Sequence, residues 1–225
     1  MAQHHNRGQD GAGAAVIKLD PHPGSQFINR VRSITNQPIV DVFSQIFATF
    51  PNDRKPLDSP AAEADWYKRN SPFIGELLVG HLRYGTYGRN TDSHCHPFIR
   101  ENNWMTRNLV LAGNFNMTNV DDQFEMLITL GQHPRERSDT ITVMEKIGHF
   151  LDDEVQKIFD KYKDRGYTNY QITDFITHEL SVRRILSRAA RDFDGGYVIA
   201  GLFGHGDSFV LRDPNGIRPA YYYYD

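Results

Sequence analysis

Two short apolar runs, each broken off by polar and glycine residues, constrain the fold of this sequence most. The first, Leu77–Val79, leads into GHLRYGTYG, and the second, Leu109–Leu111, leads into AGNFNMTN. An apolar run that ends in Gly, Asn, Thr and Arg is typical of a buried strand that stops beside a polar pocket. We therefore expect the functional residues at the ends of these two strands.

Polar side chains at the two strand ends have the chemistry of a small-molecule site. The guanidinium of Arg83 is a planar fork that suits a carboxylate, and Thr86 adds a hydroxyl three residues later. On an isolated edge strand the same arginine would make a surface ion pair, so it decides little alone. After the second run, Asn114 and Asn116 place side-chain amides beside backbone N–H groups, an arrangement that can form an oxyanion hole.

A helix is predicted before the first of these strands. Pro38 suits the first turn of a helix, and Ile39, Phe43, Ile46 and Phe50 recur at helical spacing after it. These four residues form one apolar stripe. The stripe predicts a helix that packs on one face of a sheet.

Three later segments also have helical periodicity. The first follows Asn119, a candidate N-cap. The second, 138–165, is long, and Asp139 in its first turn complements the helix dipole. The third, 170–193, is predicted to break near Ser181.

Strand patterns fill the remaining parts of the chain. YVIAGLFG and DSFVLRD are typical of a hairpin, and DPNG is a turn sequence that leads into PAYYYYD. These three segments are residues 197–204, 207–213 and 219–225, and two further strands are predicted over residues 14–20 and 27–33. Strands, then helices, then strands again indicate an α+β fold with antiparallel sheets.

Two further segments allow alternative interpretations. Residues 51–70, rich in proline and charge, predict an exposed loop or insertion, with a contact surface as the alternative. His94, Cys95 and His96 carry metal-ligating atoms, but a strand would point Cys95 away from the two histidines. No second ligand cluster with zinc spacing occurs in the sequence. We predict a structural role for these three residues and no metal site.

Composition excludes several functional classes. The 225 residues are 39% hydrophobic and 12% aromatic, which suits a packed core. A formal net charge of −3 leaves no electrostatic footprint for nucleic acid or an anionic membrane. No apolar run approaches the roughly 18 residues of a membrane span, and a single cysteine excludes a disulfide framework. We expect a cytoplasmic protein without nucleic-acid or membrane partners.

Five ordered motifs resemble those of class II (N-terminal nucleophile) glutamine amidotransferases. GHLRYGTYG is similar to the GHxRYxTxG motif of that family, and LAGNFNMTN is similar to its xHNGNxTN motif. HNRGQDGAG at 5–13 resembles HRGQ(D/E)xAG, and RSDT at 137–140 resembles (T)SD(S/T). LRDPNGIRP at 211–219 is closest to the RDPxGIRP form of the glutamine phosphoribosylpyrophosphate amidotransferases, which open purine synthesis. The resemblance covers nearly the whole chain.

The resemblance implies a fold, a reaction and roles for particular residues. The fold is the four-layer α/β/β/α sandwich of N-terminal nucleophile hydrolases. The reaction is attack of a terminal cysteine thiol, with its own α-amine as base, on the side-chain amide of glutamine. Arg83 and Thr86 would bind the α-carboxylate of the substrate, and Asp139 would bind its ammonium group. The Asn114 amide and the Phe115 N–H would bind the oxyanion. Arg7 and Gly8 would line the nucleophile's pocket.

The chain departs from the family pattern at its start and in one motif. The family cysteine lies in a strand well before the HRGQ segment, but here Arg7 is almost at the start and the only cysteine is Cys95. Gly113 replaces the family histidine and Phe115 the family glycine, and a phenylalanine is strained wherever φ must be positive. We expect residues 1–225 to be a partial glutaminase domain, truncated at both ends, that binds glutamine weakly and does not hydrolyse it.

The resemblance also implies partners and cofactors. We expect glutamine as the ligand, no cofactor in this domain, and Mg²⁺ only for the phosphoribosyltransferase domain that this sequence lacks. The full enzyme is expected to be a homo-oligomer. Two alternatives stay open: the glutaminase domain of an asparagine synthetase or glucosamine-phosphate synthase, and a non-catalytic glutamine-binding or interaction module.

Overall fold

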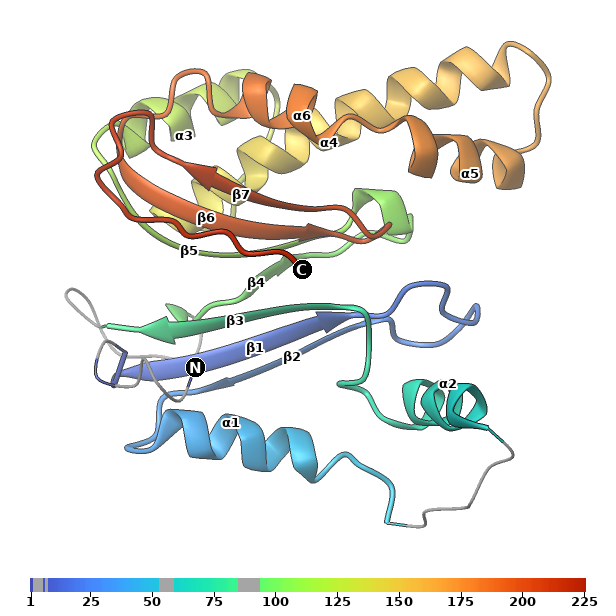
Figure 1. Ribbon diagram of the computed structural model, residues 1–225. Coiled ribbons are helices and arrows are strands. Elements are labelled where there is room, and N and C mark those ends of the chain that lie inside the picture. The colour runs from blue at the N-terminus through green and yellow to red at the C-terminus, as the bar shows by residue number, and fades with distance from the viewer. Residues whose placement is uncertain (2–5, 7, 53–58, 85–93) are drawn as a thin grey trace. The chain divides into compact units, whose positions relative to one another are not determined.

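The computed structural model divides the chain into two compact units, Met1–Phe98 and Ile99–Asp225. The residues that the structure describes are Met1, Asn6, 8–52, 59–84 and 94–225. Each unit contains one sheet with a helix or helices on one face (Figure 1). The strand β1 pairs antiparallel with β2 and β3, and β6 pairs antiparallel with β5 and β7. The predicted α+β class with antiparallel pairing is therefore confirmed.

The first unit is built on a three-stranded sheet in the order β2-β1-β3. Its elements are β1 (Gly11–Ile17), β2 (Ile28–Ser33), α1 (Pro38–Phe47), α2 (Pro60–Asn70) and β3 (Leu77–Arg83). The helix α1 lies on β1 and β2, where Val42 packs with Ala12 and Val31. The sheet thus holds the end of β3, where Arg83 stands, beside the start of β1.

The apolar stripe predicted for α1 is only partly right. Val42, which that stripe omits, is fully buried, whereas Phe43 is 38% exposed and Phe47 is 64% exposed. The rings of Phe43, Phe47 and Phe50 lie against one another, with centroids 6.1 and 5.9 Å apart. Apolar residues surround more than half of α1, so periodicity alone did not select the face that meets the sheet.

The loop predicted over 51–70 is wrong for its second half, which forms α2. Residues 53–58 of that prediction lie outside the described residues. Ser59 caps the helix through its hydroxyl, and the ammonium of Lys18 binds carbonyls at the other end at 2.6 and 2.9 Å. No residue of α2 is buried, so the helix carries no apolar stripe that the sequence pattern would reveal.

The second unit is built on a four-stranded sheet in the order β4-β5-β6-β7. The strands are β4 (Phe98–Arg100), β5 (Leu109–Met117), β6 (Gly195–Phe203) and β7 (Ser208–Arg212). A short 3₁₀ helix, η3 (Met105–Arg107), precedes β5. The predicted hairpin between the last two strands is confirmed.

Four helices of the second unit lie on one face of this sheet (Figure 1). They are α3 (Val120–Thr129), α4 (Asp139–Lys163), α5 (Asn169–Glu179) and α6 (Val182–Ala189). The predicted start at Ser138 and the predicted break near Ser181 are confirmed, since each hydroxyl accepts a backbone N–H as the N-cap of a helix. The helix α4 buries Ile147, Leu151 and Val155. Among the described residues, no helix is long and apolar enough to cross a membrane.

The strand predicted over 219–225 does not form. The Asp213 carboxylate accepts the N–H groups of Ile217 (2.8 Å) and Arg218 (3.1 Å). This turn leads the chain over Gly196, where a Cβ would lie 2.8 Å from the side chain of Ile217. Residues 219–225 join neither sheet of the described residues, so the segment stays irregular despite its β-forming residues.

Candidate functional site

The first group of predicted site residues lies where the chain crosses β3 before entering β1. A Cβ at Gly8 would lie 2.3 Å from the Cβ of Leu82, the residue before Arg83. Only glycine fits such a close approach. The structure thus brings Gly8 and the end of β3 together. Arg7 and Thr86, predicted to act with them, lie outside the described residues.

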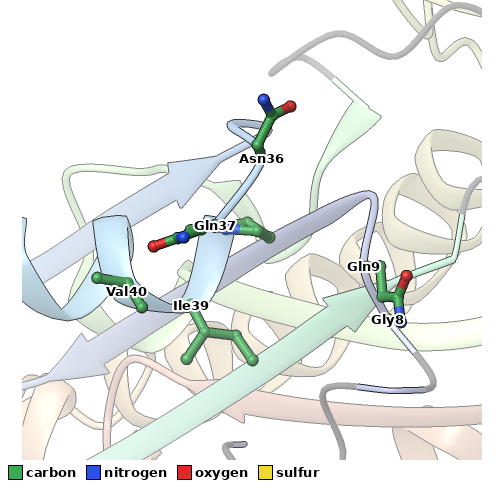
Figure 2. Close-up of a pocket in the computed structure, with 7 residues that line it drawn as sticks. Gly8, Gln9, Asn36, Gln37, Ile39 and Val40 are labelled. Carbon is green, nitrogen blue, oxygen red and sulfur yellow. The ribbon is translucent and has the colours of Figure 1, made fainter.

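A cavity of about 390 Å³ is lined by Gly8, Gln9 and residues 36–40 at the start of α1 (Figure 2). None of these residues is charged. The side chains of Asn36 and Gln37 point in different directions, and Gln37 does not cap α1 (Figure 2). The cavity is therefore uncharged and largely apolar, with the side chains of Pro38, Ile39 and Val40 beside a few amides.

The second group of predicted residues lies where β5 ends and α4 begins. The Oδ2 atom of Asp139 accepts the N–H of Met117 at 2.9 Å. The hydroxyl of Ser138 caps the same helix, which places Asp139 in the first turn, where the helix dipole favours a carboxylate. Asn114 is exposed three residues before Met117. Asp139 thus fixes the end of the strand that carries Asn114.

The hydrogen-bond ladder of β5 determines where the Phe115 N–H points. The N–H of Thr118 donates to the carbonyl of Asp194 at 3.0 Å, so alternate residues of β5 bond to β6 and the intervening ones face the other side. The N–H groups of Phe115 and Met117 both point away from β6, and Asp139 accepts the second. Because alternate residues of a strand are about 7 Å apart, the Asp139 carboxylate lies about 7 Å along β5 from the Phe115 N–H.

Phe115 occupies the place of the family glycine without the strain considered from the sequence. Within the described residues, Asp20 is the only non-glycine residue with positive φ. A Cβ at Gly113 would lie 2.9 Å from two atoms of the Phe115 ring. The family pattern has a histidine side chain at residue 113. Here the Phe115 ring occupies that space.

The loop between α6 and β6 holds the end of β5. The Asn119 side chain donates to the Asp192 carbonyl (2.8 Å) and accepts the Asp194 N–H (3.2 Å). The Thr118 hydroxyl donates to the Asp194 carboxylate. Asn119 stands at the predicted N-cap position, but its side chain makes these bonds instead of capping α3. Sequence reasoning missed this role because Asp194 lies 75 residues further along the chain.

A fully buried lysine supports the same loop. The Lys146 ammonium donates to the Gln123 side chain, lies 3.9 Å from the Asp192 carboxylate and 5.0 Å from the centre of the Phe193 ring. Gln123 in turn donates to the Asp192 carbonyl at 2.9 Å. Burial lowers the pKa of Lys146, and the Asp192 carboxylate offsets part of that effect.

We expect Lys146→Met to change the pH dependence of stability. Since the pKa of Lys146 is lower in the folded protein, the unfolded state binds more protons between that pKa and the ordinary value of 10.5. The unfolding free energy should therefore rise with pH across this window, and Lys146→Met should remove the rise. Gln123→Leu, which takes away the buried ammonium's acceptor, should cost about 2 kcal/mol. Urea titrations between pH 7 and 10 measure both effects, and a rise that persists in Lys146→Met would contradict the assignment.

The segment His94–His96 packs inside the first unit. Cys95 is fully buried, and its thiol donates to the carbonyl of Ala12 at 3.4 Å. The rings of His96 and His81 lie 4.5 Å apart. In the described part of the chain, no group of three His, Cys, Asp or Glu side chains is placed to hold a metal. The thiol is a core group of the fold.

A family model described as class-II glutamine amidotransferases matches residues 43–166. This range is more than half of the 225 residues and contains β3, β5 and the start of α4. The chain belongs to the class-II glutamine amidotransferases. The matched range includes Arg83, Asn114, Phe115 and Asp139. The family inferred from the five motifs is therefore confirmed.

Two curated relatives of this amidotransferase chain are amidophosphoribosyltransferases. The protein from Pasteurella multocida (strain Pm70) is 29% identical over 147 residues, which are 64% of this chain and 25% of the relative. The protein from Pseudomonas aeruginosa is 27% identical over 158 residues, 65% of this chain and 25% of the relative. The chain spans about a quarter of the length of these relatives.

Solved structures share the fold of this amidotransferase chain. The glutamine phosphoribosylpyrophosphate amidotransferase of B. subtilis, complexed with ADP and GMP, aligns with a TM-score of 0.55 and 18% identity over 97% of this chain and 34% of that one. A structure of the allosteric regulatory enzyme of purine biosynthesis aligns with a TM-score of 0.56 and 18% identity, covering 96% and 34%. The α+β fold of the N-terminal nucleophile type is thereby confirmed.

Proposed function

We propose that this chain binds glutamine for an amidophosphoribosyltransferase, in which ammonia from the glutamine side chain is transferred to phosphoribosyl pyrophosphate at the start of purine synthesis. The names of its relatives support this assignment. The segment LRDPNGIRP also has the motif form of that subfamily. Because the chain spans about a quarter of these relatives, a phosphoribosyltransferase domain would carry the transfer, in a homo-oligomeric enzyme.

The geometry at the end of β5 carries this proposal. A glutamine molecule has an ammonium group at one end and a side-chain amide at the other. The Asp139 carboxylate, an ammonium acceptor, lies at the end of the strand that carries Asn114 and Phe115. The family motif assigns the Phe115 N–H to the oxyanion that forms at the other end of the glutamine. Asn114 supplies a second oxyanion donor, and each such donor is typically worth about 3–4 kcal/mol of the barrier.

The family motifs also assign glutamine-binding roles to residues of the first unit. Arg83 would clamp the α-carboxylate of glutamine with help from Thr86, while Arg7 and Gly8 would line the pocket of the attacking thiol. Cys95 does not suit that attack, because it is fully buried and donates to a core carbonyl. This polypeptide is therefore expected to bind glutamine without releasing ammonia from it.

We expect Arg83→Ala and Asp139→Asn each to weaken glutamine binding tenfold or more, because each removes a charge-assisted hydrogen bond worth about 1.5–3 kcal/mol. Arg83→Lys should recover only part of the affinity, since an ammonium lacks the planar fork. Arg135→Ala, at an exposed arginine outside the proposed site, is the matched control. Chemical-shift titration with glutamine measures all four affinities.

Two outcomes would contradict the proposal. Equal affinity for glutamine in the wild type and in both site variants would show that Arg83 and Asp139 do not form a glutamine site. Ammonia release above background that Arg83→Ala abolishes would show that the chain supplies its own nucleophile.

A further inference from the structure

The outer edge of the second unit's sheet is an open strand beside a groove. The strand β7 is last in the sheet order, and no other strand of the described residues pairs with its far side. One face of α6 and residues 209–211 of β7 line the groove. Val210 is 61% exposed there. An exposed apolar edge strand is a template for pairing with another chain.

The backbone of β7 presents hydrogen-bonding groups along this edge. The N–H of Phe203 donates to the carbonyl of Asp207 (2.8 Å), and the N–H of Asp213 donates to the carbonyl of Tyr197 (3.0 Å). These bonds fix which residues of β7 face β6. By the alternation of an antiparallel ladder, the N–H and C=O groups of residues 208, 210 and 212 point outward.

Positive charge lies on the α6 wall of the groove. Arg184 and Arg188 each pair with Glu154 of α4 at 3.0 Å. Arg183 and Arg191 line the groove, are exposed, and form no ion pair with a carboxylate of the described residues. The groove thus combines an apolar strand edge with two arginines that have no internal counter-charge.

The two arginines lie at the two ends of the helical wall. Arg183 is in the first turn of α6, and Arg191 follows two residues after its last residue, Ala189, and both line the groove. Side chains four residues apart on one face of a strand are about 13 Å apart. We propose that an acidic extended segment of another protein adds to β7 as a further strand. Two carboxylates of that segment would face Arg183 and Arg191, and an apolar side chain between them would contact Leu186.

The positive charge of Arg183 and Arg191 favours an acidic segment over a second copy of this chain at the β7 edge. Two-fold pairing of β7 with its own copy would place the Arg183 and Arg191 walls of both copies on the same face of one continuous sheet. Such like charges disfavour association, whereas an acidic strand neutralises them. The surface uses none of the residues assigned to glutamine, so binding there is independent of the proposed function.

The test uses the full chain and a fluorescein-labelled peptide, TETVTET, whose two glutamates flank a valine on one face. We expect saturable binding in fluorescence anisotropy that weakens at least fivefold in Arg183→Glu and in Arg191→Glu, and that falls with added salt. Arg135→Glu, at an exposed arginine that does not line the groove, should bind the peptide like wild type. Circular dichroism checks that each variant is folded.

Modified peptides distinguish strand addition from simple charge attraction. N-methylation of one alternate set of peptide amides should abolish binding, while N-methylation of the other set should leave it intact. Replacing both glutamates by lysine should weaken binding more than tenfold. Equal binding of these peptides, or unchanged binding in both arginine variants, would overturn the proposal. A dimer in analytical ultracentrifugation that Val210→Pro dissociates would overturn it in favour of self-pairing.

Discussion

Replacing Gly195 by alanine is expected to lower the unfolding free energy by about 3 kcal/mol and to weaken glutamine binding. Gly195 has φ of +123°, and a Cβ there would lie 2.3 Å from the carbonyl oxygen of Asn116 and 3.0 Å from the Cα of Met117. The strand end that Asp139 holds must therefore shift. Urea denaturation and glutamine titration measure the two losses.

Gly131→Ala is the matched control for this prediction. Gly131 also has positive φ, +79°, but a Cβ there would meet nothing within 4 Å. Its substitution should lower the unfolding free energy by only about 1 kcal/mol, the cost of a positive φ at a non-glycine residue, and should leave glutamine binding unchanged. Equal losses in the two variants would show that backbone conformation, and not the contact with β5, makes Gly195 necessary.

A second large effect is expected from exchanging the large and small side chains of residues 113 and 115. Gly113→His should lower the unfolding free energy by about 2–3 kcal/mol. A Cβ at residue 113 would lie only 2.9 Å from the Phe115 ring and 2.7 Å from the Val198 carbonyl, so the histidine would clash with both. Phe115→Gly should cost about 2 kcal/mol through the space it leaves. In the double variant, the histidine can occupy that space, so the loss should be at least 1 kcal/mol smaller than the sum.

A double-mutant cycle in urea tests this exchange. Gly113→His combined with Ile172→Val, a buried change on α5, serves as the additive reference. Additivity in the Gly113 and Phe115 pair as well would mean that the ring does not occupy the volume of a residue 113 side chain. The family histidine and glycine would then have been replaced independently.

Local sequence signals predicted much of the fold because they depend on a few neighbouring residues. The apolar runs before Arg83 and Asn114 form β3 and β5, and Ser138 caps α4 at the predicted residue. Capping and β-propensity act within one turn or one strand, so they can be read without knowledge of distant contacts.

The incorrect predictions concern segments whose state depends on what lies beside them. The helix α2 buries no residue, so no apolar stripe revealed it. The tyrosine-rich segment 219–225 has strand composition but joins neither sheet of the described residues, and Phe43 is 38% exposed because Val42 meets the sheet. Each of these outcomes is decided by burial or pairing, and neither can be read from residue type alone.

By itself, the sequence determined the family and the residue types at the strand ends: the guanidinium of Arg83, the amide of Asn114 and the carboxylate of Asp139. Only the tertiary structure decided that Asp139 accepts the Met117 N–H and that Asn119 holds a loop 75 residues away. Motifs record which groups the chemistry needs. The partners that orient those groups are distant along the chain, so their identity depends on how the chain packs.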